Sequence, residues 1–144
     1  MESQRNQKFQ KIQKSEHLDE IFSALSSPIR RAIIERVSAS DCTVNEIFET
    51  IKIRLKNHEI PELPDKRTKK MRPITREAIS QHLHILIDAQ LIEQTKQGRI
   101  RQCNLNPKPL STAFNWLVRY RIFWEQFLDE IQEKVEKNEE NNNE

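Results

Sequence analysis

The first forty residues place their apolar side chains at the three- and four-residue spacing of amphipathic helices. A helix over residues 17–25 gathers one apolar side from Leu18, Ile21, Phe22 and Leu25. A second helix, over residues 28–39, buries Ile29, Ile33, Ile34 and Val37. Ser27 precedes this helix as an N-cap, and Pro28 suits its first turn because that turn needs no backbone N–H donor. The pattern predicts two consecutive helices after a flexible basic tail over residues 1–16.

Two further helices each begin at a threonine. Thr43 and Glu46 have the spacing of a capping box, and a short helix follows with Val44, Ile47, Phe48 and Ile51 inward. Thr75 caps another helix that continues to about Ala89. Its buried face consists of Ala78, Ile79, Leu83 and Leu86, flanked by His82 and Ile85. Its polar face consists of Glu77, Ser80, Gln81, His84 and Asp88.

The last part of the chain predicts a hairpin and then one long helix. Residues 91–95 and 100–105 alternate as strands around Gly98, which supplies the turn. The helix over residues 109–137 carries two neighbouring apolar stripes. One is Leu110, Phe114, Leu117, Trp124, Leu128, Ile131 and Val135, interrupted by Arg121, and the other is Ala113, Trp116, Tyr120, Phe123 and Phe127. A small domain cannot cover so wide a face, so one stripe packs on the chain's own core and the other on a second copy.

Charge is distributed unevenly, although the chain of 144 residues has a net charge of only +2. Residues 52–101 hold 12 Lys and Arg against 6 Asp and Glu, whereas residues 125–144 hold 2 Lys against 8 Asp and Glu. The basic middle includes a polar, proline-containing segment over residues 52–73. The acidic, Asn-rich end predicts a disordered tail over residues 138–144. This distribution indicates a local site for a polyanion on an otherwise balanced protein.

Composition excludes several classes of protein. Gly98 is the only glycine, which excludes the glycine-rich phosphate loops of nucleotide-binding enzymes. Neither paired catalytic carboxylates nor a catalytic triad can be placed, so the sequence predicts no enzyme. Cys42 and Cys103 lie far apart and form no disulfide framework or zinc motif; Cys103 is expected to be structural, and no pattern supports a redox role. The polar N-terminus and the absence of a long apolar run predict a cytoplasmic protein without a membrane span.

The order of elements predicts an all-α-rich winged helix: the third and fourth helices form a helix-turn-helix, and the hairpin is its wing. A helix of this kind fits the DNA major groove and contacts bases with residues near its N-terminus. The candidate base-contacting residues of this helix are Thr75, Arg76, Glu77, Ser80, Gln81 and His84. Arg76 is suited to guanine and Gln81 to adenine, whereas the Glu77 carboxylate disfavours phosphate. The candidate wing contacts to backbone or minor groove are Lys96, Arg99 and Arg101.

Three segments together resemble the ArsR/SmtB family of winged-helix repressors. They are LSSPIRRAIIERV, TVNEI and ITREAISQHLHILIDAQLIEQTKQGRIRQCNLNPKPL, and the terminal FNWLVRYRIFWEQFLDEI is similar to SdpR-like, metal-independent members. The resemblance covers roughly residues 18–131. It implies a homodimer built on the first and last helices that binds an imperfect palindrome, with Ser80, Gln81 and His84 contacting bases. The interface residues implied are Leu18, Phe22, Leu117, Trp124, Leu128 and Ile131.

The chain departs from the family pattern at three places. Residues 52–73 lengthen the connection between the two motif helices by about twenty residues, either as a phosphate-binding strip or as a solvated loop. The speculative backbone contacts there are Lys66, Arg67, Lys69, Lys70 and Arg72. Gln90 stands where the family usually has a helix-ending glycine, so left-handed backbone strain is expected. Glu77 replaces a common proline.

The sequence leaves several functions open. Metal-sensing members carry Cys-x-Cys in the first motif helix or Asp and His sets on the last helix, and neither set is present, so no metal or other cofactor is expected. His17, His58, His82 and His84 have no ligand spacing. A regulator of this fold acts as a repressor by occupying an operator, or as a ligand-responsive or activating regulator. The rivals are a winged-helix adaptor that binds a protein instead of DNA, and an antitoxin-like partner protein.

Overall fold

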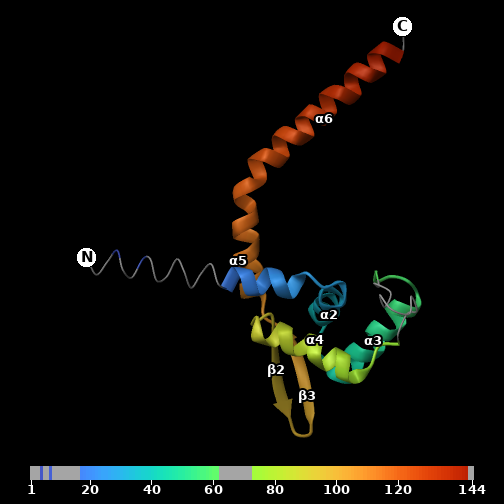
Figure 1. Ribbon diagram of the computed structural model, residues 1–144, viewed down its shortest axis with the longest axis vertical. Helices are drawn as coiled ribbons and strands as arrows, with labels where there is room; N and C mark the ends of the chain where they lie inside the picture. The colour runs from blue at the N-terminus through green and yellow to red at the C-terminus, as the bar shows by residue number, and fades with distance from the viewer. Residues whose placement is uncertain (1–3, 5–6, 8–16, 62–72, 143–144) are drawn as a thin grey trace, which may run out of the picture. The chain divides into compact units, whose positions relative to one another are not determined.

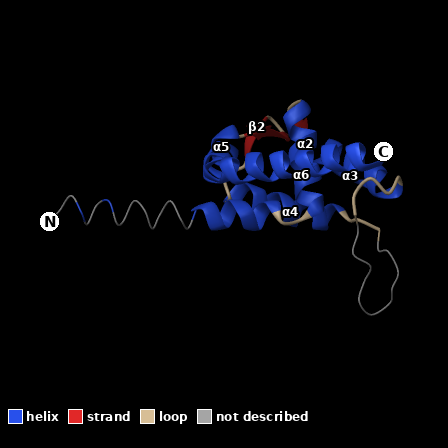
Figure 2. Ribbon diagram, turned by 90° about the horizontal axis from the view of Figure 1, so that it is seen from above, coloured by secondary structure: helices blue, strands red, loops and turns tan. Residues whose placement is uncertain are grey.

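The computed structural model describes residues 4, 7, 17–61 and 73–142, with side chains described as far as residue 137. It divides into two compact units, Met1–Ser111 and Thr112–Glu144. The first unit contains a helix over residues 17–25, then α2 (Pro28–Ala39), β1 (Cys42–Thr43), α3 (Val44–Lys56), α4 (Arg76–Asp88), β2 (Ile92–Gln97) and β3 (Ile100–Leu105). The helix α5 (Pro107–Leu117) begins in this unit and ends in the second (Figure 1). The fold is mainly helical with a small sheet, as the sequence predicts (Figure 2).

The predicted helix starts are confirmed in atomic detail. The Ser27 hydroxyl accepts a hydrogen bond from the Arg30 backbone N–H at 3.4 Å, and α2 has the bounds predicted from its pattern. Thr43 and Glu46 form the reciprocal capping box of α3, with distances of 2.7 and 3.3 Å. These hydrogen bonds also lower the pKa of the Glu46 carboxyl. Each such cap is worth about 1 kcal/mol, because it satisfies a helix N–H that has no partner within the helix.

The sheet has one strand more than the sequence predicts. The order is β1-β3-β2, with all neighbours antiparallel, so the two-residue β1 lies at one edge beside β3. The hairpin turn consists of Gly98 and Arg99, and Gly98 has φ +64° while Arg99 does not have a positive φ. A glycine with positive φ at the first central position is typical of a two-residue type II′ turn, which follows the right-handed twist of the strands. β2 therefore continues two residues beyond the predicted end at Thr95.

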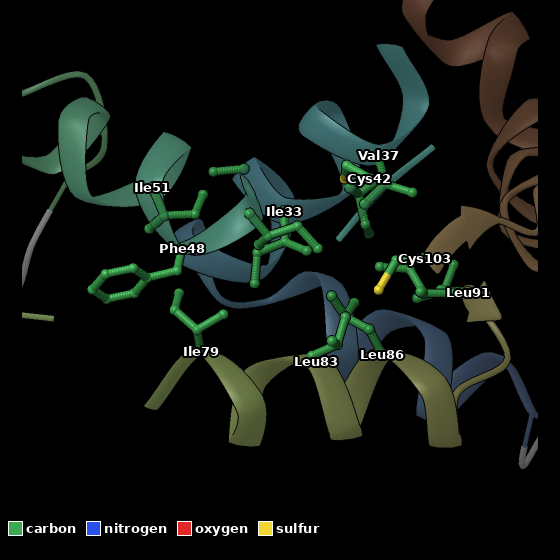
Figure 3. Close-up of a cluster of buried hydrophobic side chains, with 14 of the residues drawn as sticks. Ile33, Val37, Cys42, Phe48, Ile51, Ile79, Leu83, Leu86, Leu91 and Cys103 are labelled. Carbon is green, nitrogen blue, oxygen red and sulfur yellow. The ribbon is translucent and has the colours of Figure 1, made fainter. Parts of the chain in front are cut away.

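One apolar core fills the first unit. Its fully enclosed members come from every element packed there: Ile33 from α2, Ile47 and Ile51 from α3, Leu83 and Leu86 from α4. Figure 3 shows Ile33, Ile51, Leu83 and Leu86 converging between the helices and the sheet. The buried positions of α4 are the predicted Ile79, Leu83 and Leu86. Because this face is fixed in the core, the polar face of α4 is held toward solvent.

The connection between α3 and α4 begins later than predicted. α3 continues to Lys56 because Leu55 is buried and extends its apolar face by one turn, so residues 52–56 are helical and do not belong to a loop. Ile60 then turns back into the core, and Arg54 is paired with Glu35 at 2.8 Å and with Glu59 at 3.4 Å. Residues 62–72, which include all five proposed backbone contacts of the insertion, lie outside the described residues.

The predicted continuous terminal helix is broken. α5 ends at Leu117, a 3₁₀ turn covers Val118–Tyr120, and α6 covers Arg121–Asn142. A 3₁₀ turn advances about 120° per residue rather than about 100°, so three residues add about 60° of rotation. The Tyr120 ring of this turn lies beside the rings of Trp116 and Phe123, with centroids 5.1 and 6.4 Å apart. α6 continues to Asn142 and so includes residues 138–142 of the segment in which a disordered tail was predicted.

Candidate nucleic-acid interface

The exposed face of α4 presents the residues that the sequence singled out. Thr75 caps the helix by accepting a hydrogen bond from the Ala78 backbone N–H at 3.1 Å. Ser80, Gln81 and His84 are exposed on the same side of the helix, one turn and two turns further along. None of these three side chains forms a hydrogen bond with another described residue, and all three are therefore available to an external partner.

A hollow on the surface brings α4 and the wing together. It is lined by residues from α3, α4, β2 and β3, namely Val44, Ser80, Gln81, Leu83, His84, Ile87, Gln94 and Arg101. The three polar residues of α4 and the Arg101 guanidinium therefore converge on one surface. Gln94, which the sequence did not single out, adds an amide to the same wall. Gln94 could have been found from the sequence, because it lies two residues from Ile92 on β2 and so shares the face of the strand that turns toward the core.

The register of the wing places Lys96 and Arg101 on the same face of the hairpin, and Arg101 lines this hollow. Cross-strand pairs on the core-facing side are Ile92 with Leu105, Gln94 with Cys103, and Lys96 with Arg101. This face of the hairpin is therefore buried at the Ile92–Leu105 pair and carries two cations, Lys96 and Arg101, toward the tip. Like charges directly opposite each other on antiparallel strands destabilise a sheet by roughly 0.2–1 kcal/mol. Neither cation has a carboxylate partner within the described residues, so an anion bound here would relieve their repulsion.

Arg99 lies in the hairpin turn, exposed, next to Gly98 at the tip of the wing. It does not line the hollow that contains Arg101. The structure thus separates the three wing cations into a pair on the strands and a single residue at the tip. Figure 1 shows the hairpin extending away from the helices of the first unit, which leaves this tip accessible.

Arg76 is arranged differently from the other predicted base contacts. Its guanidinium lies 4.7 Å from the centroid of the Phe48 ring, donates a hydrogen bond to the Asn45 side chain, and is 4.0 Å from a Glu49 carboxylate oxygen. All three partners are on α3. In this arrangement Arg76 ties the start of α4 to α3, and contact with a base requires these interactions to be given up.

His82 faces the interior side of α4. Its Nδ1 atom is buried without a hydrogen-bond partner among the described residues. Burial, and after it the positive charge of Arg30, lowers the pKa of the His82 imidazole. The neutral form therefore predominates in the folded chain at neutral pH, in keeping with a structural rather than a phosphate-binding position.

Two arginines at the start of α2 have a structural task that the sequence did not reveal. The Arg30 Nε donates to the Ala24 carbonyl at 2.6 Å, and an Arg31 terminal nitrogen donates to the Leu25 carbonyl at 2.7 Å. These carbonyls end the helix over residues 17–25, where cations stabilise the negative end of the helix dipole. Within that helix Leu18 and Phe22 are half-buried.

The second unit presents the remaining predicted interface residues. Leu117, Trp124, Leu128 and Ile131 expose between 41% and 65% of their surface. Aromatic rings pack along the helix itself, with centroids 5.1 Å apart for Trp116 and Tyr120 and 6.4 Å apart for Trp124 and Phe127. So large an exposed apolar surface typically marks an interaction site.

Other kinds of site are not evident in the part of the chain that the structure describes. It contains no group of three or more His, Cys, Asp and Glu side chains arranged to hold a metal ion. No described helix combines the length and the apolar character needed to cross a lipid bilayer.

The arrangement of α3, α4 and the β2–β3 hairpin defines a winged helix-turn-helix, and comparisons with known proteins agree. The chain is 33% identical to an HTH-type transcriptional regulator, YuzN of Bacillus subtilis (strain 168), over 101 residues that span 69% of this chain and 94% of YuzN. It is 25% identical to the transcriptional repressor SdpR of the same organism over 103 residues, which span 72% of this chain and 91% of SdpR. No protein-family model matches the chain.

Solved structures give the same result. The crystal structure of an ArsR family transcriptional regulator superposes with a TM-score of 0.56 at 29% identity, covering 77% of this chain and 93% of that protein. An ArsR-like regulator from Rhodococcus sp. RHA1 shares the fold, with a TM-score of 0.54 at 22% identity, covering 83% and 92% of the two chains. The chain belongs to the ArsR family of winged helix-turn-helix transcriptional regulators.

Proposed function

We propose that this protein represses transcription by binding a palindromic operator as a homodimer. The observation that carries the proposal is the convergence of Ser80, Gln81 and His84 with Arg101 around one hollow. The α4 side chains would contact base edges in the major groove, and Arg101 with Lys96 would hold the phosphate backbone. In this arrangement phosphate contacts provide most of the affinity and make it salt-dependent, whereas base contacts determine which sequence is preferred.

Within this proposal the exposed side chains of α4 have separate roles. Gln81 pairs with adenine through its amide, which can donate and accept at once. His84 and Ser80 lie on the same exposed face and contact neighbouring bases or phosphates. Arg76 holds α4 against α3 through Phe48 and Asn45 and thereby positions the reading residues.

The homodimer forms through the exposed stripe of the terminal helices, which supplies Leu117, Trp124, Leu128 and Ile131, together with Leu18 and Phe22 of the helix over residues 17–25. Two copies are needed because an operator with two half-sites is recognised by two α4 helices about one helical turn of DNA apart. The basic residues Lys66, Arg67, Lys69, Lys70 and Arg72 are proposed as additional backbone contacts in the long α3–α4 connection.

Fluorescence anisotropy with a duplex from upstream of the protein's own gene, and with a scrambled duplex of the same composition, tests the proposal at two salt concentrations. We expect preferential binding that weakens steeply with salt. The variant Gln81→Ala/His84→Ala should lose about 1–3 kcal/mol of discrimination per lost base contact while binding the scrambled duplex as before.

The variant Arg101→Gln should instead weaken both duplexes alike and reduce the salt slope by about one. Lys134→Gln, which removes one positive charge from α6, is the matched control and should leave binding unchanged. If the wild-type protein binds neither this duplex nor genomic fragments selected from a library, the DNA-binding proposal is wrong, and a protein adaptor acting through the terminal helix becomes the better explanation.

A further inference from the structure

The two cysteines of the chain are neighbours in space. Cys42 and Cys103 are 61 positions apart in the sequence, yet they are direct register partners in the antiparallel pair formed by β1 and β3. Both belong to the same buried cluster, and neither has any exposed surface (Figure 3). Both are free thiols.

Directly opposed residues of antiparallel strands have Cα atoms about 4.5–5.5 Å apart, and their side chains project from the same face of the sheet. A disulfide requires a Cα separation of about 4.4–6.8 Å. The backbone therefore already has the spacing that a cross-strand disulfide needs, and bond formation requires only rotation of the two side chains. The Cys103 sulfur at present accepts a weak hydrogen bond from the Gln94 amide at 3.7 Å.

The surroundings keep the thiols reduced and slow to react while the sheet is closed. Burial raises the pKa of both the Cys42 and the Cys103 thiol, so both are protonated at neutral pH. Access depends on β1, which is only two residues long and forms an edge of the sheet. Short edge segments open at a small fraction of the free energy of global unfolding, and such an opening exposes Cys42 to small reagents.

We propose that Cys42 and Cys103 form a redox-responsive pair that closes to a cross-strand disulfide in the presence of a low-molecular-weight disulfide. When β1 opens, the Cys42 thiolate attacks one sulfur of the small disulfide, forming a mixed disulfide and releasing one thiolate. As β1 returns toward β3, before the two sulfurs are enclosed again, the Cys103 thiolate attacks the Cys42 sulfur and releases the second small thiolate. The protein loses two protons and two electrons, and the small disulfide is reduced to two thiols.

The disulfide would have two structural consequences. It links the strand that leads directly into α3 with a wing strand and closes a loop of about 60 residues, which restricts the unfolded chain. It also moves the Cys103 sulfur, which now accepts a hydrogen bond from Gln94, a residue that lines the hollow with Gln81 and Arg101. The modification site therefore lies directly behind the candidate nucleic-acid interface, but its existence does not depend on DNA binding.

The test uses the full-length protein, reduced and then equilibrated under native conditions with oxidised glutathione. Free thiols are blocked with N-ethylmaleimide before intact-mass analysis and non-reducing peptide mapping. We expect a species lighter by about 2 Da that takes up no blocking reagent, runs as a monomer on a non-reducing gel, and links the Cys42 and Cys103 peptides. Its Tm should be higher by roughly 10 °C than that of the reduced protein, and reduction should reverse the shift.

The variants Cys42→Ala and Cys103→Ala should give no such species and no change of Tm on oxidation. A second measurement tests whether the folded sheet can hold the disulfide even if reagents reach the buried thiols slowly. The wild-type chain is oxidised in urea and refolded by dilution, and its thermal unfolding is compared with that of the reduced form. A disulfide form that melts below the reduced form would overturn the proposal, as would wild-type products limited to glutathione adducts or intermolecular disulfides.

Discussion

Gln90 adopts a backbone conformation that favours glycine, and replacing it with glycine should stabilise the protein. Its φ is +59°, in the left-handed region, where the Cβ of any L-residue crowds the backbone. The conformation is required because Gln90 ends α4: its N–H donates to the Ile87 carbonyl and the next N–H, of Leu91, donates to the Leu86 carbonyl, both at 2.9 Å. This pair of hydrogen bonds is a Schellman motif, which is normally completed by glycine.

The size of the effect follows from what Gln90→Gly leaves in place. The hydrogen bonds at this corner, including that from the Asn106 amide to the Gln90 carbonyl at 2.9 Å, involve the main chain of Gln90 and not its exposed side chain. The substitution therefore removes a left-handed penalty of about 1–2 kcal/mol. It adds a greater loss of backbone entropy on folding, about 0.5–1 kcal/mol. The net gain in unfolding free energy should be about 0.5–1 kcal/mol, or a Tm higher by roughly 2–4 °C.

Urea unfolding followed by circular dichroism measures this difference; the protein concentration is held fixed because the proposed dimerisation would couple to stability. Gln90→Ala is the matched control: it shortens the side chain but keeps a Cβ, so its midpoint should equal that of the wild type. A Gln90→Gly protein that is no more stable than Gln90→Ala would refute the assignment of strain to this corner.

Three other substitutions test separate parts of the structure. The pKa of His82 in the folded chain is depressed below its unfolded value of about 6.5. The contribution of the neutral imidazole to stability is therefore complete above that pH and is lost as the pH falls through the folded pKa. Urea titrations between pH 7 and pH 5 should show the wild type losing stability relative to His82→Leu. Arg54→Gln should lower the unfolding free energy by about 0.5–1 kcal/mol by removing its ion pair with the largely exposed Glu35, and the loss should shrink in 1 M salt. Leu117→Glu/Trp124→Glu should give monomers by light scattering, whereas Gln126→Glu, on the opposite side of α6, should not; a dimer that persists in the double variant would place the interface elsewhere.

Local signals in the sequence were sufficient for most of the helices. Capping residues such as Ser27, Thr43 and Thr75 act over three or four positions, so their effect can be predicted without knowledge of the rest of the fold. The same is true of Gly98 in the hairpin turn, whereas the left-handed conformation of Gln90 was expected from the resemblance to the family. The buried face of α4 followed from its period, and with it the outward direction of Ser80, Gln81 and His84.

Features that depend on partners distant in the sequence could not be predicted in this way. β1 is too short to have a period, and it is a strand only because β3 lies beside it. Because β1 was not predicted, the pairing of Cys42 with Cys103 could not be predicted either. The contacts of Arg76 are another case, because three residues of α3 determine where its guanidinium lies, and nothing in the α4 sequence indicates them.

Thr43 belongs to two elements at once, and this restricts where the protein can change length during evolution. Its backbone pairs with Gln102 in the sheet, and its side chain caps α3. Asp41, immediately before β1, accepts a hydrogen bond from the Asn104 amide at 2.6 Å and so adds another link to the same wing strand. One residue inserted between Cys42 and Glu46 would either break the cap or move β1 by one position and turn its buried side chain to solvent. The resemblance to the family implies that the connection after α3 holds about twenty additional residues, whereas this junction is expected to accept none.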